Sequence, residues 1–200
     1  MKPEIEAKFL NVDVEQVRQQ LQQAGAVLVH PMRLMRREIF DHPDGRYKKA
    51  GHVERLRIRD EGNAVTMTYK RKIAGSNYVD EVETAIGSYE HTKQILEAIG
   101  LKPQSYQESK RETWQLSEVE VVVDEWPWAK PYVEIEGPTE QAIQLAAKTL
   151  GFDWQKAKFG SVDTVYRAEY PKMSSADSIG DIAMVVFDTP LPQYLKDRQA

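Results

Sequence analysis

The stretch Glu4-Ile5-Glu6-Ala7-Lys8-Phe9 decides how the fold of this chain is interpreted. Successive side chains of a β-strand point to opposite faces of a sheet. As a strand, this hexamer places two acids and a lysine on one face and three apolar side chains on the other. Half-buried strands commonly alternate in this way. The question is therefore whether the charged face meets solvent or lines a site.

The same alternation recurs along the chain, and helical segments separate the alternating ones. Strand-like alternation covers residues 55–59, 66–70, 119–123 and 132–136. Asp13 and Ser88 each precede an amphipathic segment that ends near a glycine. A third such segment runs from about Thr139 to Gly151, and a fourth helix is expected over residues 161–170. We expect about eight strands and four helices in the order β-α-β-β-β-β-α-β-β-β-α-α, with a hairpin turn at residues 61–63.

The composition limits the class of protein. The 200 residues suit one domain, and 41% hydrophobic residues are enough for a buried core. A net charge of −4 gives no reason to expect a nucleic acid polymer as partner. The absence of cysteine excludes disulfides and thiolate metal sites.

The distribution of apolar residues bears on where the protein works. No apolar run approaches the ~20 residues that a membrane helix needs. Glu4 and Glu6 stand where a secretory signal would need an apolar core. We therefore expect a cytoplasmic protein with no membrane partner.

The last part of the chain differs from the rest. Residues 171–180 are mostly small and polar, and residues 182–187 are apolar. We therefore expect a domain over residues 1–170 and a C-terminal extension over residues 171–200. An apolar segment of this kind usually docks on its own domain or on a neighbour, and a lid over a site is the alternative.

Two architectures accommodate the charged strand faces. In one, an open sheet shows these faces to solvent, where each ion pair contributes only ~0–1 kcal/mol. In the other, the sheet closes and the charged faces line its interior. Since nearly every expected strand carries dense acid and base at alternating positions, the second is favoured. The expected fold is α+β, an antiparallel eight-stranded β-barrel with a charged interior and flanking helices.

A charged tunnel of this kind has a clear chemical use. Arg and Lys at alternating strand positions place cations every ~6.6–6.8 Å along one wall. That spacing suits an extended polyanion such as a triphosphate, whose oxygens arginine contacts in pairs. Grouped carboxylates in the same site need a cation between them, and Mg²⁺ or Mn²⁺ prefers such oxygen ligands. A bound metal could then support phosphoryl or nucleotidyl chemistry.

Several motifs, in order along the chain, resemble the CYTH superfamily, also called triphosphate tunnel metalloenzymes. Glu4–Lys8 resembles its ExExK signature, and residues 40–44 (FDHPD) resemble its FDTPD loop. The further matches are Leu56–Arg59 (LRIR), Thr66–Lys70 (TMTYK), Asp80–Glu83 (DEVE), Arg111–Trp114 (RETW), Val123–Glu125 (VDE) and Tyr132–Gly137 (YVEIEG). The resemblance spans residues 1 to about 168.

The resemblance implies a tunnel that binds a triphosphate and a divalent metal, Mg²⁺ or Mn²⁺. It implies metal-side acids at Glu4, Glu6, Asp124, Glu134 and Glu136. Glu81 and Glu83 would form a second metal position or order the basic residues. The implied phosphate contacts are Lys8, Arg57, Arg59, Lys70 and Arg111. Glu4, Glu6, Lys8 and Arg57 are the implied catalytic residues. We expect at least one of these acids to form only an internal ion pair.

The chain departs from the family pattern at several positions. Ser109 stands where the family often has a lysine, which removes one cation. His42 replaces a threonine in the FDTPD loop, and we expect it to be solvated rather than catalytic. Trp126 and Trp128 replace a glycine-rich connector, and could stack on an organic ring or pack at the tunnel rim.

The resemblance leaves the reaction open. Members of the family hydrolyse inorganic triphosphate, thiamine triphosphate or nucleoside triphosphates, or cyclise ATP. Residues 122–128 (VVDEWPW) and 132–137 (YVEIEG), together with the overall length, look closest to the class IV adenylate cyclase-like branch. We place cyclisation of ATP to cyclic AMP and pyrophosphate first, ahead of hydrolysis of inorganic or thiamine triphosphate. A non-catalytic polyphosphate or nucleotide binder is a further alternative, and a homodimer is expected by analogy alone.

Overall fold

Eight antiparallel strands form a closed barrel in this structure, a computed structural model that describes residues 2–50, 54–72, 74–75 and 78–199. The strands are β1 (Lys2–Leu10), β2 (Val27–Asp41), β3 (Glu54–Asp60), β4 (Val65–Lys72), β5 (Val79–Ala85), β6 (Lys102–Leu116), β7 (Val119–Glu125) and β8 (Tyr132–Gly137). Their order is β2-β3-β4-β5-β1-β8-β7-β6, and β6 pairs with β2 to close the barrel. The expected α+β barrel is confirmed.

The helices flank the barrel or cover its end. They are α1 (Val14–Gln23), α2 (Arg46–Lys49), α3 (Tyr89–Ala98), α4 (Glu140–Thr149), α5 (Asp163–Glu169) and α6 (Gln193–Lys196), with 3₁₀ helices at Trp154–Lys156 and Ile179–Asp181. Asp13 and Ser88 cap α1 and α3 as expected, and Thr139 caps α4. Each side chain accepts a hydrogen bond from the backbone N–H three residues later. The fourth expected helix, α5, is shorter than residues 161–170. The short helices α2 and α6 were not expected.

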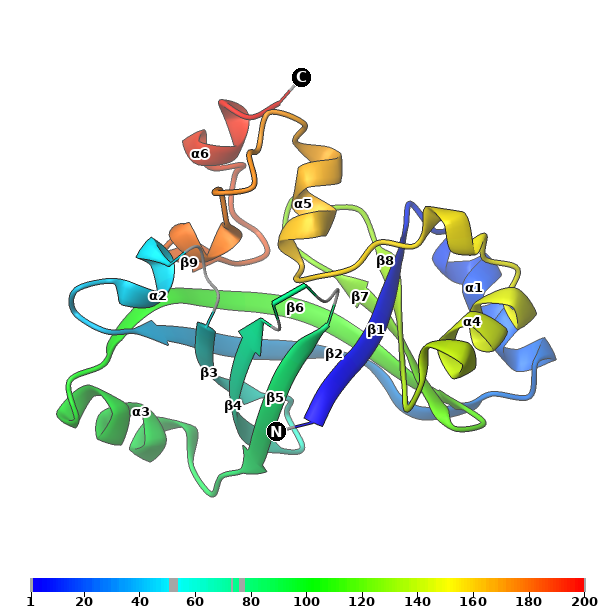
Figure 1. Cartoon of the computed structure of the whole chain (residues 1–200), viewed down its shortest axis with the longest axis horizontal. Helices are drawn as coiled ribbons and strands as arrows, with labels where there is room; N and C mark the ends of the chain where they lie inside the picture. The colour runs from blue at the N-terminus through cyan, green and yellow to red at the C-terminus, as the bar shows by residue number, and fades with distance from the viewer. Residues whose placement is uncertain (1, 51–53, 73, 76–77, 200) are drawn as a thin grey trace.

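The hydrophobic core lies outside the barrel, between its wall and the helices. Ala7 and Phe9 of β1 are buried in one cluster with Leu21 of α1 and Ile143 of α4. On another side, Leu96 of α3 packs against the β2 and β3 side chains in a separate cluster. Figure 1 shows α1 and α4 together at one flank and α3 at the other. This arrangement leaves the charged faces of the strands for the interior.

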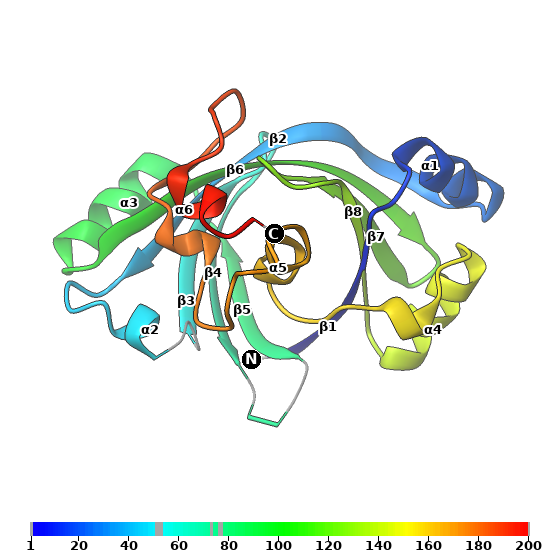
Figure 2. The ribbon, with the colours of Figure 1, turned by 90° about the horizontal axis from the view of Figure 1, so that it is seen from above.

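The last thirty residues dock on their own domain, as expected for their apolar segment. Strand β9 (Met184–Val185) pairs in parallel with β6. Val185 and Ile179 are buried in a cluster with Trp126 and Tyr166. Seen from above, α5 and the tail lie over the barrel opening (Figure 2). None of the helices in the described ranges is both long and apolar enough to span a membrane.

Helix α4 packs closely on the barrel at Gly137, the last residue of β8. This close contact predicts the effect of a substitution on stability. A Cβ at this position would lie 2.8 Å from Val119 Cγ1 and 3.0 Å from Ile143 Cγ2. Both neighbours are buried, so neither has room to move. Gly137→Ala should lower the free energy of unfolding by about 1–3 kcal/mol, or about 2–12 °C in Tm.

Gly87 provides the matched control, because a Cβ there meets nothing within 4 Å. Gly87→Ala should change the stability by less than about 0.5 kcal/mol. Equal melting temperatures for the two variants would contradict this account of the α4 contact.

Candidate active site

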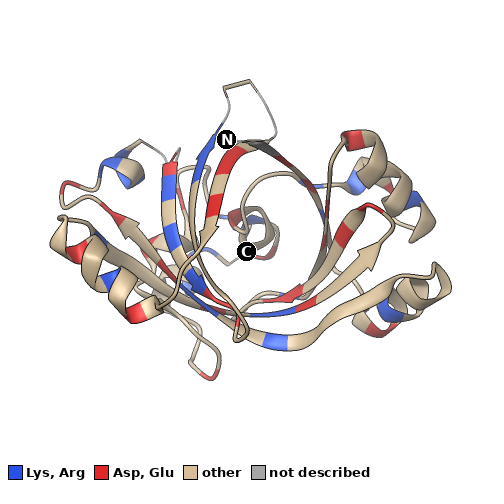
Figure 3. Cartoon of the chain, turned by 90° about the horizontal axis from the view of Figure 1, so that it is seen from below, with Lys and Arg blue, Asp and Glu red and all other residues tan. Residues whose placement is uncertain are grey.

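The inward faces of the strands form a charged tunnel with a cavity of about 370 Å³. Acidic and basic residues follow the strands around the central opening (Figure 3). Each site residue implied by the sequence lines this cavity: Glu4, Glu6, Lys8, Arg57, Arg59, Lys70, Glu81, Glu83, Arg111, Asp124, Glu134 and Glu136. The structure thus brings together all of the predicted residues, and their individual roles stay predictions.

Three of the acids form a compact carboxylate group. The register of β1 and β8 sets Glu6 directly opposite Glu136. Carboxylate oxygens of Glu4, Glu6 and Glu136 all lie within 4.8 Å of one another. Like charges opposite each other destabilise a sheet. Oxygen ligands at this separation suit a hard divalent cation such as Mg²⁺ or Mn²⁺, so the residues present are compatible with the implied metal.

Glu4 contacts Lys70 and Glu6 contacts Lys8, and the remaining predicted metal-side acids likewise contact basic or hydroxyl groups. Arg111 donates two hydrogen bonds to Asp124, at 2.7 and 2.6 Å. Lys8 lies 3.0 Å from Glu134, and Lys70 lies 2.6 Å from Glu81. Glu83 accepts a hydrogen bond of 2.6 Å from the Thr68 hydroxyl. In this arrangement these four acids orient the bases and the threonine around the tunnel.

Burial and crowding change how the carboxylates hold protons. Burial and the neighbouring Glu134 raise the pKa of Glu6 to about 8. Desolvation in the tunnel, followed by Glu4 and Glu134, raises the pKa of Glu136 to about 7. Burial also opposes ionisation of Glu134, but Lys8 and Arg111 outweigh it and lower its pKa. A divalent cation would have to displace protons from this group in order to bind.

A second zone of the tunnel concentrates positive charge. Arg37 on β2 lies opposite Arg59 on β3, and Arg55 lies opposite Lys70 on β4. Within the described part of the chain, no acid forms an ion pair with Arg37, Arg55 or Arg57. Buried cations without a counterion are costly. The positive charge of this zone would favour a bound anion.

Strand β2 contributes tunnel residues that the sequence pattern did not indicate. Arg33 and Arg37 line the cavity, together with Glu61 and Glu120 from other segments. The β2–β6 register shifts between residues 28 and 33, so simple alternation does not hold along the strand. The four-residue spacing of the two arginines, which places them on one face, was the available signal.

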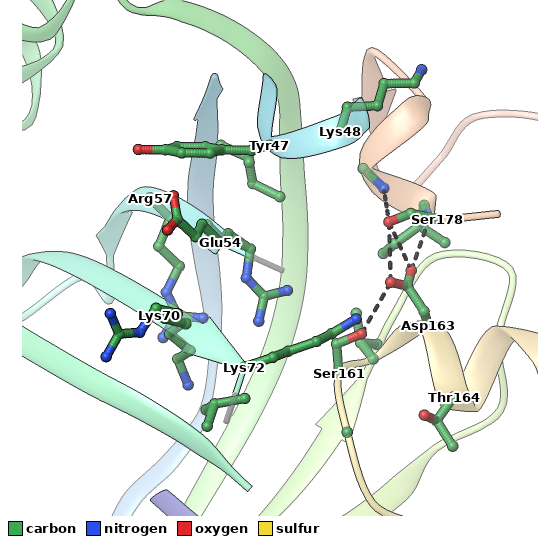
Figure 4. A pocket seen from close by; sticks show the side chains of 18 of the residues that line it. Tyr47, Lys48, Glu54, Arg57, Lys70, Lys72, Ser161, Asp163, Thr164 and Ser178 are labelled. Atoms are coloured by element: carbon green, nitrogen blue, oxygen red, sulfur yellow. Dashed lines mark hydrogen bonds between the residues drawn. The ribbon is translucent and has the colours of Figure 1, made fainter. Parts of the chain in front are cut away.

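A second cavity, also about 370 Å³, lies between the barrel mouth and the segment that contains α5 and the tail. Glu4, Arg37, Arg57 and Lys70 border both cavities, so the two adjoin. Tyr47, Lys72, Ser161 and Asp163 are among the residues around the second one (Figure 4). Its further lining includes Tyr78, Phe159, Ser178 and Gly180. The tail therefore lines a cavity, which is also the position that a lid over the site would occupy.

Asp163 ties the tail to α5 at the edge of this second cavity. It is buried and accepts hydrogen bonds from the Ser178 hydroxyl, the Ile179 amide and the Ser161 hydroxyl. Its carboxylate is therefore occupied by these contacts in the present arrangement.

The aromatic residues that replace the family connector pack internally. Trp126 is 3% exposed and meets Tyr166 edge-on, with ring centroids 6.4 Å apart. Trp128 donates its indole N–H to the Thr189 carbonyl at 2.9 Å. This matches packing at the tunnel rim rather than stacking on an organic ring. His42 packs edge-on against Tyr47, with ring centroids 5.0 Å apart.

The sequence comparisons agree with the geometry of the tunnel. The family model of the CYTH domain matches residues 2–166. The chain belongs to the CYTH family. Comparison with curated proteins gives no match.

Solved structures share the CYTH fold at low sequence identity. The PH1012 protein of Pyrococcus horikoshii is 20% identical with a TM-score of 0.65, covering 81% of this chain and 98% of its own. A candidate adenylate cyclase of Vibrio parahaemolyticus is 13% identical with a TM-score of 0.72, covering 82% and 97%. A candidate adenylyl cyclase of Hippeastrum, described as having a dominant triphosphatase activity, is 16% identical with a TM-score of 0.57, covering 82% and 95%.

The raised pKa of Glu6 predicts that the metal-free protein loses stability as pH rises. The unfolded chain releases this proton near pH 4.5, whereas the folded protein keeps it to about pH 8. Between these values the folded state binds more protons, so the free energy of unfolding should fall with pH. The slope for one such proton is at most about 1.4 kcal/mol per pH unit.

Urea unfolding of metal-free protein between about pH 5 and pH 8 measures this slope. Glu6→Gln should flatten it, because the amide is neutral at every pH. Glu118→Gln, in an exposed turn, should keep the wild-type slope. An unchanged slope in Glu6→Gln would exclude Glu6 as its source.

Proposed function

We propose that this CYTH protein is a divalent-metal-dependent enzyme that acts on a triphosphate inside its barrel. The observation that carries the proposal is the grouping of like charges: carboxylates of Glu4, Glu6 and Glu136 lie together, and Arg37 and Arg57 form no ion pair with any described acid. Lys70 and Lys8 lie beside Glu4 and Glu6 at the edge of the acidic group. A polyanion with a bound cation would neutralise both zones at once. A non-catalytic binder would need the bases alone, so the retained carboxylate group favours an enzyme.

In this proposal the chain positions the substrate by its charges. Arg57, Arg59, Lys70, Arg111 and Lys8 hold phosphate oxygens along the tunnel, where low solvent exposure strengthens each contact. Glu4, Glu6 and Glu136 would hold Mg²⁺ or Mn²⁺. When bound, such a metal supplies Lewis-acid activation of a phosphoryl group or of water. Lys8 contacts both Glu6 and Glu134 and so orients the two carboxylates.

Hydrolysis is the reaction that we now place first. The aromatic side chains of the tunnel, Trp126 and Tyr132, are nearly fully buried by protein contacts, which leaves the cavity suited to phosphate rather than to a ring. Cyclisation of ATP is the second candidate, favoured by the adjoining cavity with Tyr47, Tyr78 and Phe159. The Hippeastrum neighbour, named for cyclase activity but described by a dominant triphosphatase activity, supports this order.

A panel of substrates, resolved by product, tests the proposal. With Mg²⁺ or Mn²⁺, inorganic triphosphate should yield phosphate and pyrophosphate. Thiamine triphosphate and ATP are compared under the same conditions, with phosphate, pyrophosphate and cyclic AMP measured separately. Cyclic AMP as the main product from ATP would put the cyclase first. Absence of product from every triphosphate would contradict the enzyme proposal.

Glu136→Gln tests the metal assignment with the least disturbance, because no described base forms an ion pair with Glu136. Loss of one metal-side carboxylate should lower turnover at saturating triphosphate by at least about 100-fold, since metal activation contributes several kcal/mol. Raising the Mn²⁺ concentration should restore part of the activity. The exposed Glu118→Gln serves as control, and equal turnover in both variants would exclude Glu136 as a metal ligand.

A further inference from the structure

Arg37 is a buried guanidinium whose protein contacts satisfy only part of its hydrogen-bonding capacity. The residue is 8% exposed and borders both cavities. One of its terminal nitrogens, Nη2, donates to the Ser109 hydroxyl at 2.9 Å, whereas its buried Nε has no hydrogen-bond partner. A guanidinium carries five N–H donors. With one donor bonded to Ser109, the terminal nitrogens keep further N–H groups for an acceptor atom in the cavities that the residue borders.

The surroundings of Arg37 add positive charge instead of neutralising it. Arg37 lies opposite Arg59 in the β2–β3 register, and none of the described acids forms an ion pair with it. Burial, followed by Arg57, Arg59 and Arg111, lowers the pKa of Arg37. Such a group costs the fold free energy unless an anion joins it.

Two contacts hold the guanidinium in one orientation despite this cost. The Ser109 hydroxyl accepts a hydrogen bond from the group, and Arg37 Cζ lies over the Trp126 ring, 4.3 Å from its centroid. Stacking on an aromatic face and a single polar contact leave the charge intact. A preorganised cation of this kind loses little conformational entropy when it binds an anion.

We propose that Arg37 contacts the triphosphate directly, at the junction of the two cavities, and supplies from β2 a positive charge that β6 lacks at Ser109. This inference rests on the proposed function, because it names a further binding residue of the same site. Arg37, Arg57 and Lys70 border both cavities, whereas Lys8, Arg59 and Arg111 border the tunnel alone. Arg37 would accordingly contact the phosphoryl group that faces the second cavity.

A purely structural role for Arg37 makes the opposite prediction about stability. If its packing on Trp126 stabilised the fold, an apolar replacement would lower the melting temperature. If Arg37 is instead a buried cation without a counterion whose role is to bind a ligand, Arg37→Met removes an unfavourable charge. The melting temperature should then be equal or higher. The same variant should bind inorganic triphosphate at least about tenfold more weakly, as expected on losing a charge-assisted contact.

The experiment measures two quantities on each variant of the full chain. Calorimetric titration with inorganic triphosphate, with and without Mg²⁺, gives affinity, and thermal unfolding without ligand gives Tm. The variants are Arg37→Met, the double variant Arg37→Ser with Ser109→Lys, and the control Arg36→Gln. Arg36 is exposed on the same strand. In the double variant, a lysine from position 109 can enter the space that the arginine vacates.

Weaker binding by Arg37→Met with no loss of Tm, recovery of most of the affinity in the double variant and an unchanged control would support the inference. Wild-type affinity in Arg37→Met would overturn it, while triphosphate binding by the wild-type protein would leave the proposed function standing. Parallel loss of affinity and Tm in Arg37→Met, without recovery in the double variant, would assign Arg37 a structural role and also overturn it. Failure of the wild-type protein to bind triphosphate would overturn the proposed function and this inference together.

Discussion

The pairing register of the closed barrel is the constraint on which the rest of the structure depends. It sets Glu6 opposite Glu136 and Arg37 opposite Arg59, and closure turns both pairs inward. Like charges in such positions oppose folding. The compensating free energy comes from the outer faces of the same strands, where Ala7 and its neighbours are buried against helices. The stability of this barrel therefore resides outside it, which leaves its interior free for charge.

The interior charges divide into those neutralised within the protein and those that are not. Asp124 forms an ion pair with Arg111, and Glu134 forms one with Lys8. These pairs lower the electrostatic cost of the charged tunnel wall in the absence of ligand. Glu136 and Arg57 lack such partners among the described residues. Burial and neighbouring acids raise the pKa of Glu136, so a bound cation would stabilise its charged form most. A bound anion would likewise stabilise the arginine that lacks a counterion. Under the proposed function, ligand binding would therefore relieve the most unfavourable charge at these positions.

The sequence was sufficient where local periodicity and capping govern the structure. Strict alternation located β1, β3 and β8, and side-chain caps and apolar spacing located three helices. It failed on β2, where residues 33–38 (RLMRRE) do not alternate apolar with polar and the adjacent arginines at 36 and 37 face opposite sides. It also could not assign partners such as Lys8 and Glu134, because that choice depends on register between strands far apart in the chain. The two-residue strand β9 is too short to leave a periodic signal.

The position of the second cavity explains why the motifs indicate a family without indicating a reaction. Every triphosphate presents the same oxygens to Arg57, Lys70 and the other tunnel cations. Any organic group attached to it must lie beyond them, among residues such as Tyr47 and Ser161 that belong to no motif. The tail lines that region through Ser178 and neighbouring residues, anchored by Asp163. Under the proposed function, substrate choice would therefore depend on the segments that cover the barrel, whereas triphosphate binding would depend on its strands.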